Sequence, residues 1–315
     1  MSRSLVLALA TALVTTLFTL MSSSPARAQR PAEEAATFSA FLATGTQVNA
    51  NITYLTASGV DLKLDVYRPR GTEPRPTAII LHGGGYRINS TKEAFALNVI
   101  PWLQMGWNAI NVEYRSSGHA LAPAAVEDVR CALRWATQNA KEFNIDPNRI
   151  VLTGQSAGGH LASIGGIIPE SAGLDRRCPG REPVKVAAII SWYGVFDYTV
   201  LVEDPTRDYA VSWIGPQPNR MEVARLVSPM THIRPGLPPM LHIHGDADPT
   251  VPYDQGVREV DALKKAGNVA ELVTVPGGRH GNFPRDQVIR IWTAIESFLA
   301  RNGLTKDGPG QTAQR

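Results

Sequence analysis

The chain has 315 residues, of which 43% are hydrophobic and 19% are charged, and its formal net charge is +3 at pH 7. A composition this apolar excludes a disordered or fibrous protein, and a chain of this length can bury one large core. The sequence pI is near 8.9, but the Lys and Arg residues are scattered and form no basic run of the kind that binds nucleic acid. We therefore expect one globular domain and no nucleic-acid partner.

The first 28 residues have the pattern of a signal peptide. Arg3 gives a positive start, residues 5–21 form an apolar core, and Ala26-Arg27-Ala28 is a small-x-small cleavage site. An uncleaved membrane anchor is the alternative, because the apolar run approaches the length that spans a bilayer. We expect cleavage near Ala28, export to the periplasm or the medium, and no stable membrane anchor.

Two polar segments flank the expected domain. Residues 29–47 are rich in Ala, Glu and Thr and have little apolar periodicity, which indicates a flexible leader. Residues 303–315 form a polar tail. The folded domain is therefore expected to cover residues 48–302.

The only two cysteines, Cys131 and Cys178, are predicted to form a disulfide. Export places both in an oxidising compartment, where such bonds form and persist. Cys131 lies on a predicted helix before the strand that leads to Ser156, and Cys178 lies in a Gly-, Pro- and Arg-rich loop after the following helix. The two can therefore meet on one side of a sheet. One buried thiol and one unrelated loop thiol are the alternative.

The chain begins with a predicted hairpin and then alternates strands with helices. Residues 51–57 and 62–68 alternate apolar and polar side chains around Ser58-Gly59, which predicts an antiparallel pair. Strand-helix alternation after it is typical of a mostly parallel sheet flanked by crossover helices. Strands are expected at 77–81, 107–113, 149–153, 186–192, 240–244 and 270–275, and helices at 92–104, 123–140, 253–266 and 288–301, with another beginning at Gly159.

One long segment interrupts this alternation. Residues 196–239 are rich in Pro, Asp, Tyr and Trp and show no strong periodicity. Loops this long are uncommon unless they are functional. We expect a small lid or pocket wall inserted here.

A serine lies between a predicted strand and a predicted helix, in Gly154-Gln155-Ser156-Ala157-Gly158. The glycines let the backbone turn sharply and keep Cβ atoms away from the turn, so the hydroxyl points out at the carboxyl end of the sheet. This pattern predicts a nucleophile elbow. A plain glycine-rich helix N-terminus is the alternative, because the motif is short and common.

A second glycine cluster follows the buried strand at 77–81, in His82-Gly83-Gly84-Gly85-Tyr86. Three successive glycines expose backbone N–H groups and permit positive φ, which makes a donor-lined pocket at the end of the strand. A simple flexible turn is the alternative. The serine motif elsewhere in the chain favours the donor-lined pocket.

Ser156, Asp248 and His280 each follow a predicted strand, and open α/β sheets bind ligands at the carboxyl ends of their strands. A hydroxyl becomes a good nucleophile when an imidazole removes its proton, and the imidazole needs a carboxylate to fix its tautomer. The sequence therefore predicts a Ser-Asp-His triad. Asp246 and Asp197 are the alternatives to Asp248 as the acid.

His280 is favoured as the base among seven histidines because glycines flank its loop, so that its side chain can reach a site. The other histidines are expected to have no catalytic role. His242 and His244 are expected to pack in a strand, His160 to buttress the elbow, His82 to support the glycine loop, and His119 and His232 to lie at the surface.

At these motifs the sequence resembles the α/β-hydrolase superfamily, and within it the serine esterases that carry a His-Gly-Gly-Gly loop before Gly-x-Ser-x-Gly. The likeness extends over residues 53–299 and is to feruloyl and acetyl-xylan esterases and to hormone-sensitive-lipase-like carboxylesterases. The segments that carry it are 82–86, 122–129, 154–158, Ser228-Pro229 and 244–249.

The resemblance implies an α/β-hydrolase fold with a small lid insertion at 196–239. It also implies Ser156 as nucleophile, Asp248 as acid and His280 as base. The oxyanion hole would use backbone N–H groups from Gly83, Gly84, Gly85 and Ala157.

Together these features predict an exported serine carboxylic ester hydrolase that acts through an acyl-enzyme. Its expected substrates are short-chain, acetylated-sugar or feruloyl-type esters, either as small molecules or on a polymer. Such chemistry needs no metal or cofactor. Tyr86 and Trp213 are possible walls of the substrate pocket. A prolyl-oligopeptidase-like serine peptidase and a non-catalytic binding protein of the same fold are the alternatives.

Overall fold

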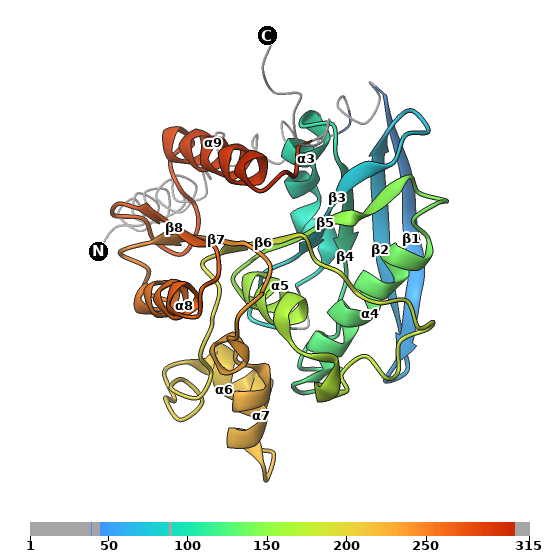
Figure 1. Ribbon diagram of the computed structural model, residues 1–315. Coiled ribbons are helices and arrows are strands. Elements are labelled where there is room, and N and C mark those ends of the chain that lie inside the picture. Colours follow the sequence, from blue (N-terminus) through green and yellow to red (C-terminus); the bar gives the residue numbers. More distant parts are fainter. Residues whose placement is uncertain (1–38, 40–44, 88–89, 306–315) are drawn as a thin grey trace, which may run out of the picture. The chain divides into compact units, whose positions relative to one another are not determined.

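Figure 1 shows the computed structural model of the chain. The structure describes residue 39 and residues 45–87 and 90–305. The predicted signal peptide, most of the predicted leader and most of the polar tail lie outside the described residues, so these expectations stay predictions. The chain divides into two compact units, Met1–Gly45 and Thr46–Arg315, and the fold below is that of the second.

The second unit is built on one eight-stranded sheet with the order β1-β2-β4-β3-β5-β6-β7-β8. The predicted hairpin forms β1 and β2, and β2 also runs antiparallel to β4, whereas the remaining neighbours are parallel. The sheet is therefore mostly parallel, as the alternating pattern predicts. The strands are β1 (Thr46–Ala57), β2 (Val60–Pro69), β3 (Arg75–Leu81), β4 (Asn108–Val112), β5 (Ile145–Gln155), β6 (Ala188–Trp192), β7 (Met240–Gly245) and β8 (Ala270–Val275).

Helices cover both faces of this sheet. Figure 1 shows α3 and α9 on one face and α4, α5 and α8 on the other, which is the layering that right-handed crossovers produce. The helices are η1 (Lys92–Val99), α3 (Ile100–Gln104), α4 (Ala124–Gln138), α5 (Ala157–Ile167), η2 (Glu170–Ala172), α6 (Asp208–Ile214), α7 (Arg220–Val227), η3 (Pro229–His232), α8 (Asp254–Lys265) and α9 (Arg285–Arg301).

The single helix expected at 92–104 is instead two short elements, η1 and α3. Pro101 lies at the start of α3. Because proline has no backbone N–H, it cannot continue a helical hydrogen-bond ladder from the preceding turn, but it fits the first turn of a new helix. The prediction of one continuous helix was therefore wrong at this point.

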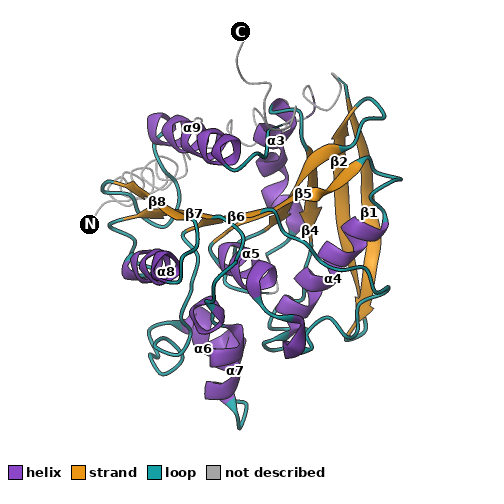
Figure 2. Ribbon diagram, in the orientation of Figure 1, coloured by secondary structure: helices purple, strands orange, loops and turns teal. Residues whose placement is uncertain are grey.

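The long segment 196–239 contains α6, α7 and η3, and it lies on the α5 and α8 side of the sheet (Figure 2). Many of its apolar side chains are buried, among them Phe196, Trp213 and Val227. The segment thus packs into the main hydrophobic core and is more than an extended loop. Its role as a lid stays a prediction.

The helix α5 is the most deeply buried helix around the serine. Gly165 and Gly166 let it approach its neighbours closely, because a Cβ at either position would lie 2.6 Å from a carbon of Val129 or Ile189. The predicted disulfide is also present in this layer: Cys131 in α4 is bonded to Cys178 after α5. Close packing against α4 and β6 thus fixes the position of α5, which begins directly after Ser156.

Candidate active site

Ser156 occupies the turn between β5 and α5. Its φ of 54° and ψ of −117° are strained for a residue that bears a Cβ. The turn is possible because its flanks are glycines: a Cβ on Gly154 would lie 2.4 Å from the Gly158 carbonyl oxygen, and one on Gly158 would lie 2.0 Å from the Leu81 carbonyl oxygen. The Ser156 N–H donates to the Trp192 carbonyl at 2.8 Å, which anchors the turn to β6.

The structure brings Ser156, His280 and Asp248 into one hydrogen-bonded chain. His280 Nε2 lies 2.8 Å from Ser156 Oγ, and His280 Nδ1 lies 2.7 Å from Asp248 Oδ2. Asp248 follows β7 and His280 follows β8, so all three side chains come from the carboxyl ends of parallel strands. With Nδ1 donating to the carboxylate, Nε2 is left free to accept the serine proton.

The Asp248 carboxylate is fully buried and accepts three hydrogen bonds, from His280 and from two backbone N–H groups. Oδ1 accepts from the backbone N–H groups of Thr250 and Val251 at 2.8 and 3.0 Å, while Oδ2 faces His280 and His244. Burial acts to raise the pKa of Asp248, but the contacts with His244 and His280 outweigh it, and the pKa lies well below its usual range. The group is therefore an anion at neutral pH.

Neither alternative acid approaches His280. Asp246 accepts a hydrogen bond from the Gly277 N–H at 2.6 Å and is exposed. Asp197 pairs with Arg258 at 2.5 Å. Of the three carboxylates considered from the sequence, only Asp248 is within hydrogen-bond distance of the imidazole.

The glycine loop lies beside the serine. Gly83, Gly84 and Gly85 line the same cavity as Ser156, and the last two have φ values of 113° and 62°. Ala157 is the first residue of α5, where backbone N–H groups have no partner within the helix. The four residues predicted for the oxyanion hole thus lie next to the nucleophile, and their role in catalysis stays a prediction.

His82 supports this loop from below. Its Nδ1 lies 2.9 Å from the Gly83 carbonyl oxygen, and its ring stacks on Tyr114 with centroids 4.0 Å apart. The Tyr114 hydroxyl in turn donates to the His82 carbonyl at 2.7 Å. This agrees with the supporting role expected from the sequence.

Tyr86 and Trp213, the two expected pocket residues, lie in the core instead. They are 1% and 0% exposed, and their rings stack at 4.0 Å. The Tyr86 hydroxyl is 2.6 Å from His160 Nδ1 and 2.7 Å from the Tyr198 hydroxyl. Large rings and satisfied hydroxyls of this kind stabilise a core, so the prediction that they contact substrate was wrong.

The cavity at Ser156 measures about 340 Å³ and is walled by aromatic side chains. Phe95, Tyr209 and Arg87 line it and were not predicted, and Tyr193 lines it as well. Tyr209 comes from α6, so the segment 196–239 does reach the cavity. No motif distinguishes Tyr209 in the sequence from the other tyrosines, and only the tertiary contacts of α6 reveal it.

Two other histidines are buried and structural. His160 in α5 accepts from Tyr86 and donates to the Val227 carbonyl at 2.7 Å. Burial lowers its pKa to about 3. His242 in β7 faces Glu259 at 3.4 Å; burial lowers the pKa of this imidazole and raises that of the carboxyl. Both rings are therefore unsuited to accept a proton near neutral pH.

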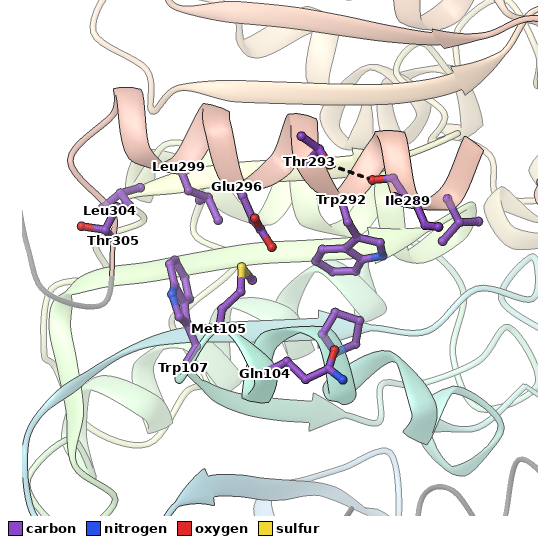
Figure 3. A pocket seen from close by; sticks show the side chains of 12 residues that line it. Gln104, Met105, Trp107, Ile289, Trp292, Thr293, Glu296, Leu299, Leu304 and Thr305 are labelled. Carbon is purple, nitrogen blue, oxygen red and sulfur yellow. Dashed lines mark hydrogen bonds between the residues drawn. The ribbon is translucent and has the colours of Figure 1, made fainter. Parts of the chain in front are cut away.

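A larger cavity of about 660 Å³ lies between α3 and α9 (Figure 3). Its walls are mostly apolar and include Met105, Trp107, Trp292 and Leu299, with Glu296 as the one carboxylate among the lining residues. No residue of the predicted triad or glycine loop lines it. Cavity size alone would therefore have pointed to this space between α3 and α9 and not to the cavity at Ser156.

Among the described residues, no cluster of three or more His, Cys, Asp or Glu side chains could hold a metal ion. A search of the same residues also finds no helix with the length and apolar character needed to cross a membrane.

Comparison with known proteins agrees with this geometry. The sequence pattern of the BD-FAE family matches residues 64–263. The chain belongs to the BD-FAE family. This membership and the sheet described above give the chain the α/β-hydrolase fold that the motifs predict.

Two esterase structures resemble this BD-FAE chain closely. A thermophilic esterase from Thermogutta terrifontis, Est2, is 29% identical, superposes with a TM-score of 0.69, and covers 86% of this chain and 96% of its own. A truncated carbohydrate esterase from gut microbiota is 28% identical, with a TM-score of 0.68, and covers 81% of this chain and 97% of its own. Both comparisons extend over nearly the whole of the described fold.

A curated relative is esterase LipC of Mycobacterium tuberculosis, which is 29% identical over 231 residues. The match covers 69% of this chain and 56% of LipC. The chain spans about half the length of the curated relatives that it matches.

Proposed function

We propose that this chain is an exported serine carboxylic ester hydrolase. The observation that carries the proposal is the hydrogen-bonded chain from Ser156 through both ring nitrogens of His280 to Asp248, beside the glycine loop. Membership of the BD-FAE family and likeness to esterases support the same reaction. The signal-peptide pattern of residues 1–28 and the disulfide support export, because disulfides persist in oxidising compartments.

In this mechanism Ser156 Oγ attacks the ester carbonyl carbon while His280 Nε2 takes the hydroxyl proton. The negative oxygen of the tetrahedral intermediate accepts hydrogen bonds from backbone N–H groups of the glycine loop and Ala157. The intermediate collapses, the carbon–oxygen bond to the alcohol breaks, and the alcohol leaves with the proton from His280. Water then attacks the acyl-enzyme with His280 as base, which releases the acid and restores Ser156.

The substrates we propose are short-chain, acetylated-sugar or feruloyl-type esters. A cavity of about 340 Å³ accommodates a small acyl group or a single ring. Phe95, Tyr193 and Tyr209 offer aromatic surfaces on which a sugar or an aryl ring can pack. Turnover of acetylated sugars, methyl ferulate and p-nitrophenyl esters of increasing chain length ranks these classes directly.

The decisive experiment removes the nucleophile. Ser156→Ala is expected to abolish hydrolysis of p-nitrophenyl acetate and to prevent labelling by an organophosphate, which in the wild type should add to the Ser156 peptide. Ser163→Ala is the matched control, since Ser163 lies in α5, the helix that follows Ser156, and its hydroxyl is buried without a hydrogen-bond partner among the described residues. Retention of more than a few per cent of turnover in Ser156→Ala would contradict the proposal.

A further inference from the structure

The acid of the triad contacts a second imidazole that the proposed mechanism does not use. His244 Nε2 lies 3.2 Å from Asp248 Oδ2, the same oxygen that faces His280 Nδ1 at 2.7 Å. His244 belongs to β7 and is completely buried. One carboxylate oxygen is therefore shared by two histidines, of which only one faces the substrate cavity.

The contacts of His244 define its protonation state. Nε2 also lies 3.1 Å from the Val251 carbonyl oxygen, so both of its neighbours are acceptors and Nε2 must carry the proton. Nδ1 is buried and has no hydrogen-bond partner in the described part of the chain. A buried N–H without an acceptor is costly, whereas a bare lone pair costs less. His244 therefore carries a proton on Nε2, which faces both acceptors.

Among the residues that the structure describes, the other groups named against His244 are uncharged or face elsewhere, and Asp248 is the charged one that it contacts. Tyr253, at the start of α8, packs its ring edge against the imidazole with centroids 5.7 Å apart. Thr274 lies opposite on β8, and its hydroxyl is hydrogen-bonded to Tyr253 at 2.5 Å. His242, two residues earlier on β7, faces Glu259 instead of Asp248.

His280 has a similarly short set of titratable neighbours. Asp248 faces Nδ1, and the Tyr193 ring packs edge-on at 4.7 Å. Burial raises the pKa of Tyr193, so it is neutral over the working range. Arg87 lines the same cavity but is paired with Asp208 at 2.9 Å.

We propose that His244 is a positioning residue for the Asp248–His280 pair. Its Nε2–H is hydrogen-bonded to the Val251 carbonyl and also lies 3.2 Å from Oδ2, and its partial positive charge there moderates the strength of the hydrogen bond from His280 to the same oxygen. The inference rests on the proposed function. An oxygen that already faces one N–H donor attracts a second donor less strongly. Without His244 the carboxylate should hold the protonated form of His280 more tightly, and the enzyme should need a higher pH to become active.

Two amide variants test this directly. In His244→Gln the amide nitrogen can occupy the place of Nε2 and keep the donor, whereas in His244→Asn the shorter side chain removes it. We expect the acid limb of the kcat/KM profile to move to higher pH by about half a unit to one unit in the Asn variant and to stay near the wild-type position in the Gln variant. If the Asn variant does not fold, His244→Leu replaces it, with the same expected shift.

His242→Asn is the matched control, because it removes a buried imidazole from the same strand without touching Asp248. Its acid limb should coincide with that of the wild type even if its melting temperature falls. An acid limb that stays in place in His244→Asn, or that moves equally in the Gln and His242 variants, would overturn the positioning role.

Histidine NMR in a Ser156→Ala background separates this inference from the proposed function, since it requires no turnover. The titration midpoint of the His280 ring should rise in the Asn variant and stay in place in the Gln variant. A midpoint that does not move in the Asn variant would disprove the assignment. If the wild-type protein hydrolyses no ester, by contrast, the proposed function is refuted, but the NMR result for His280 in the His244 variants remains valid.

Discussion

His280 and His160 show that the same side chain has different properties in two regions of one molecule, the cavity at Ser156 and the core. Each ring has both nitrogens hydrogen-bonded. His280 is 20% exposed at the cavity and faces a carboxylate, so a positive charge on its ring is stabilised. His160 is buried among neutral partners, and desolvation lowers its pKa to about 3. The environment, and not the hydrogen-bond count, decides which ring can exchange a proton.

The largest expected effect is the loss of the exposed imidazole. His280→Gln should lower kcat/KM for a chromogenic ester by at least about 10⁴-fold, because no base remains to accept the Ser156 proton. Since the ring lies at a cavity surface, the free energy of unfolding should change by less than about 1 kcal/mol. Urea titration and the kinetic assay check both values. A large loss of stability would contradict the distinction between a catalytic His280 and a structural His160.

The second prediction removes the charge that distinguishes the two rings. Asp248→Asn should lower turnover by about 10³- to 10⁴-fold, because an amide can neither hold the imidazole in the required tautomer nor stabilise its positive form. Steady-state kinetics measure the effect. Activity near the wild-type level would show that the carboxylate is not the reason why His280, and not His160, can accept a proton.

The buried ring should show the opposite behaviour. His160→Ala leaves a cavity and removes the partners of Tyr86 and the Val227 carbonyl, so the free energy of unfolding should fall by about 2–4 kcal/mol. Turnover per folded molecule should fall far less than in the His280 variant. Denaturant unfolding and active-site titration separate the two effects, and an inactive but fully stable variant would contradict the assignment.

The smallest effect concerns pH. His160 binds a proton in the unfolded chain below about pH 6.5 but stays neutral when folded until about pH 3. The unfolded state therefore holds the extra proton in this window, and stability should fall as the pH drops, by about 1.4 kcal/mol per unit from this residue. His160→Gln should flatten the dependence by that amount between pH 6 and 4. Equal slopes for the two proteins would mean that His160 is protonated in the fold.

Much of the sheet could be predicted because the spacing of apolar residues along the sequence indicates which side chains are buried. The hairpin at Ser58-Gly59 and the buried strands agree with the structure to within a few residues, since alternation and continuous apolar runs reflect which faces are covered. β1 and β5 are the largest exceptions: they begin at Thr46 and Ile145, although strands were expected from 51 and 149. The register of β5 with β3 shifts near its start, so an irregular stretch is accommodated within the strand.

The candidate site divides in the same way. Ser156, Asp248 and His280 could be chosen from the sequence because each follows a strand and carries local turn signals. Tyr86 and Trp213 were assigned to the wrong environment, because an aromatic residue near a motif suits a pocket and a core equally well. The long segment 196–239 decides between them: it folds over Tyr86 and buries it, and it presents Tyr209 to the cavity instead.

The sequence by itself determined the order of the elements, the glycines that permit the turn at Ser156, and the residue types of the triad. These properties are local, because they depend on backbone freedom and on the period of apolar side chains. Only the tertiary structure decided which carboxylate meets His280, which rings line the cavity, and that His244 shares the oxygen of Asp248. Most of those contacts join residues far apart in the chain, and even His244 and Asp248, four residues apart, meet only because of how the turn after β7 folds. Their distances are set by how helices, strands and turns pack.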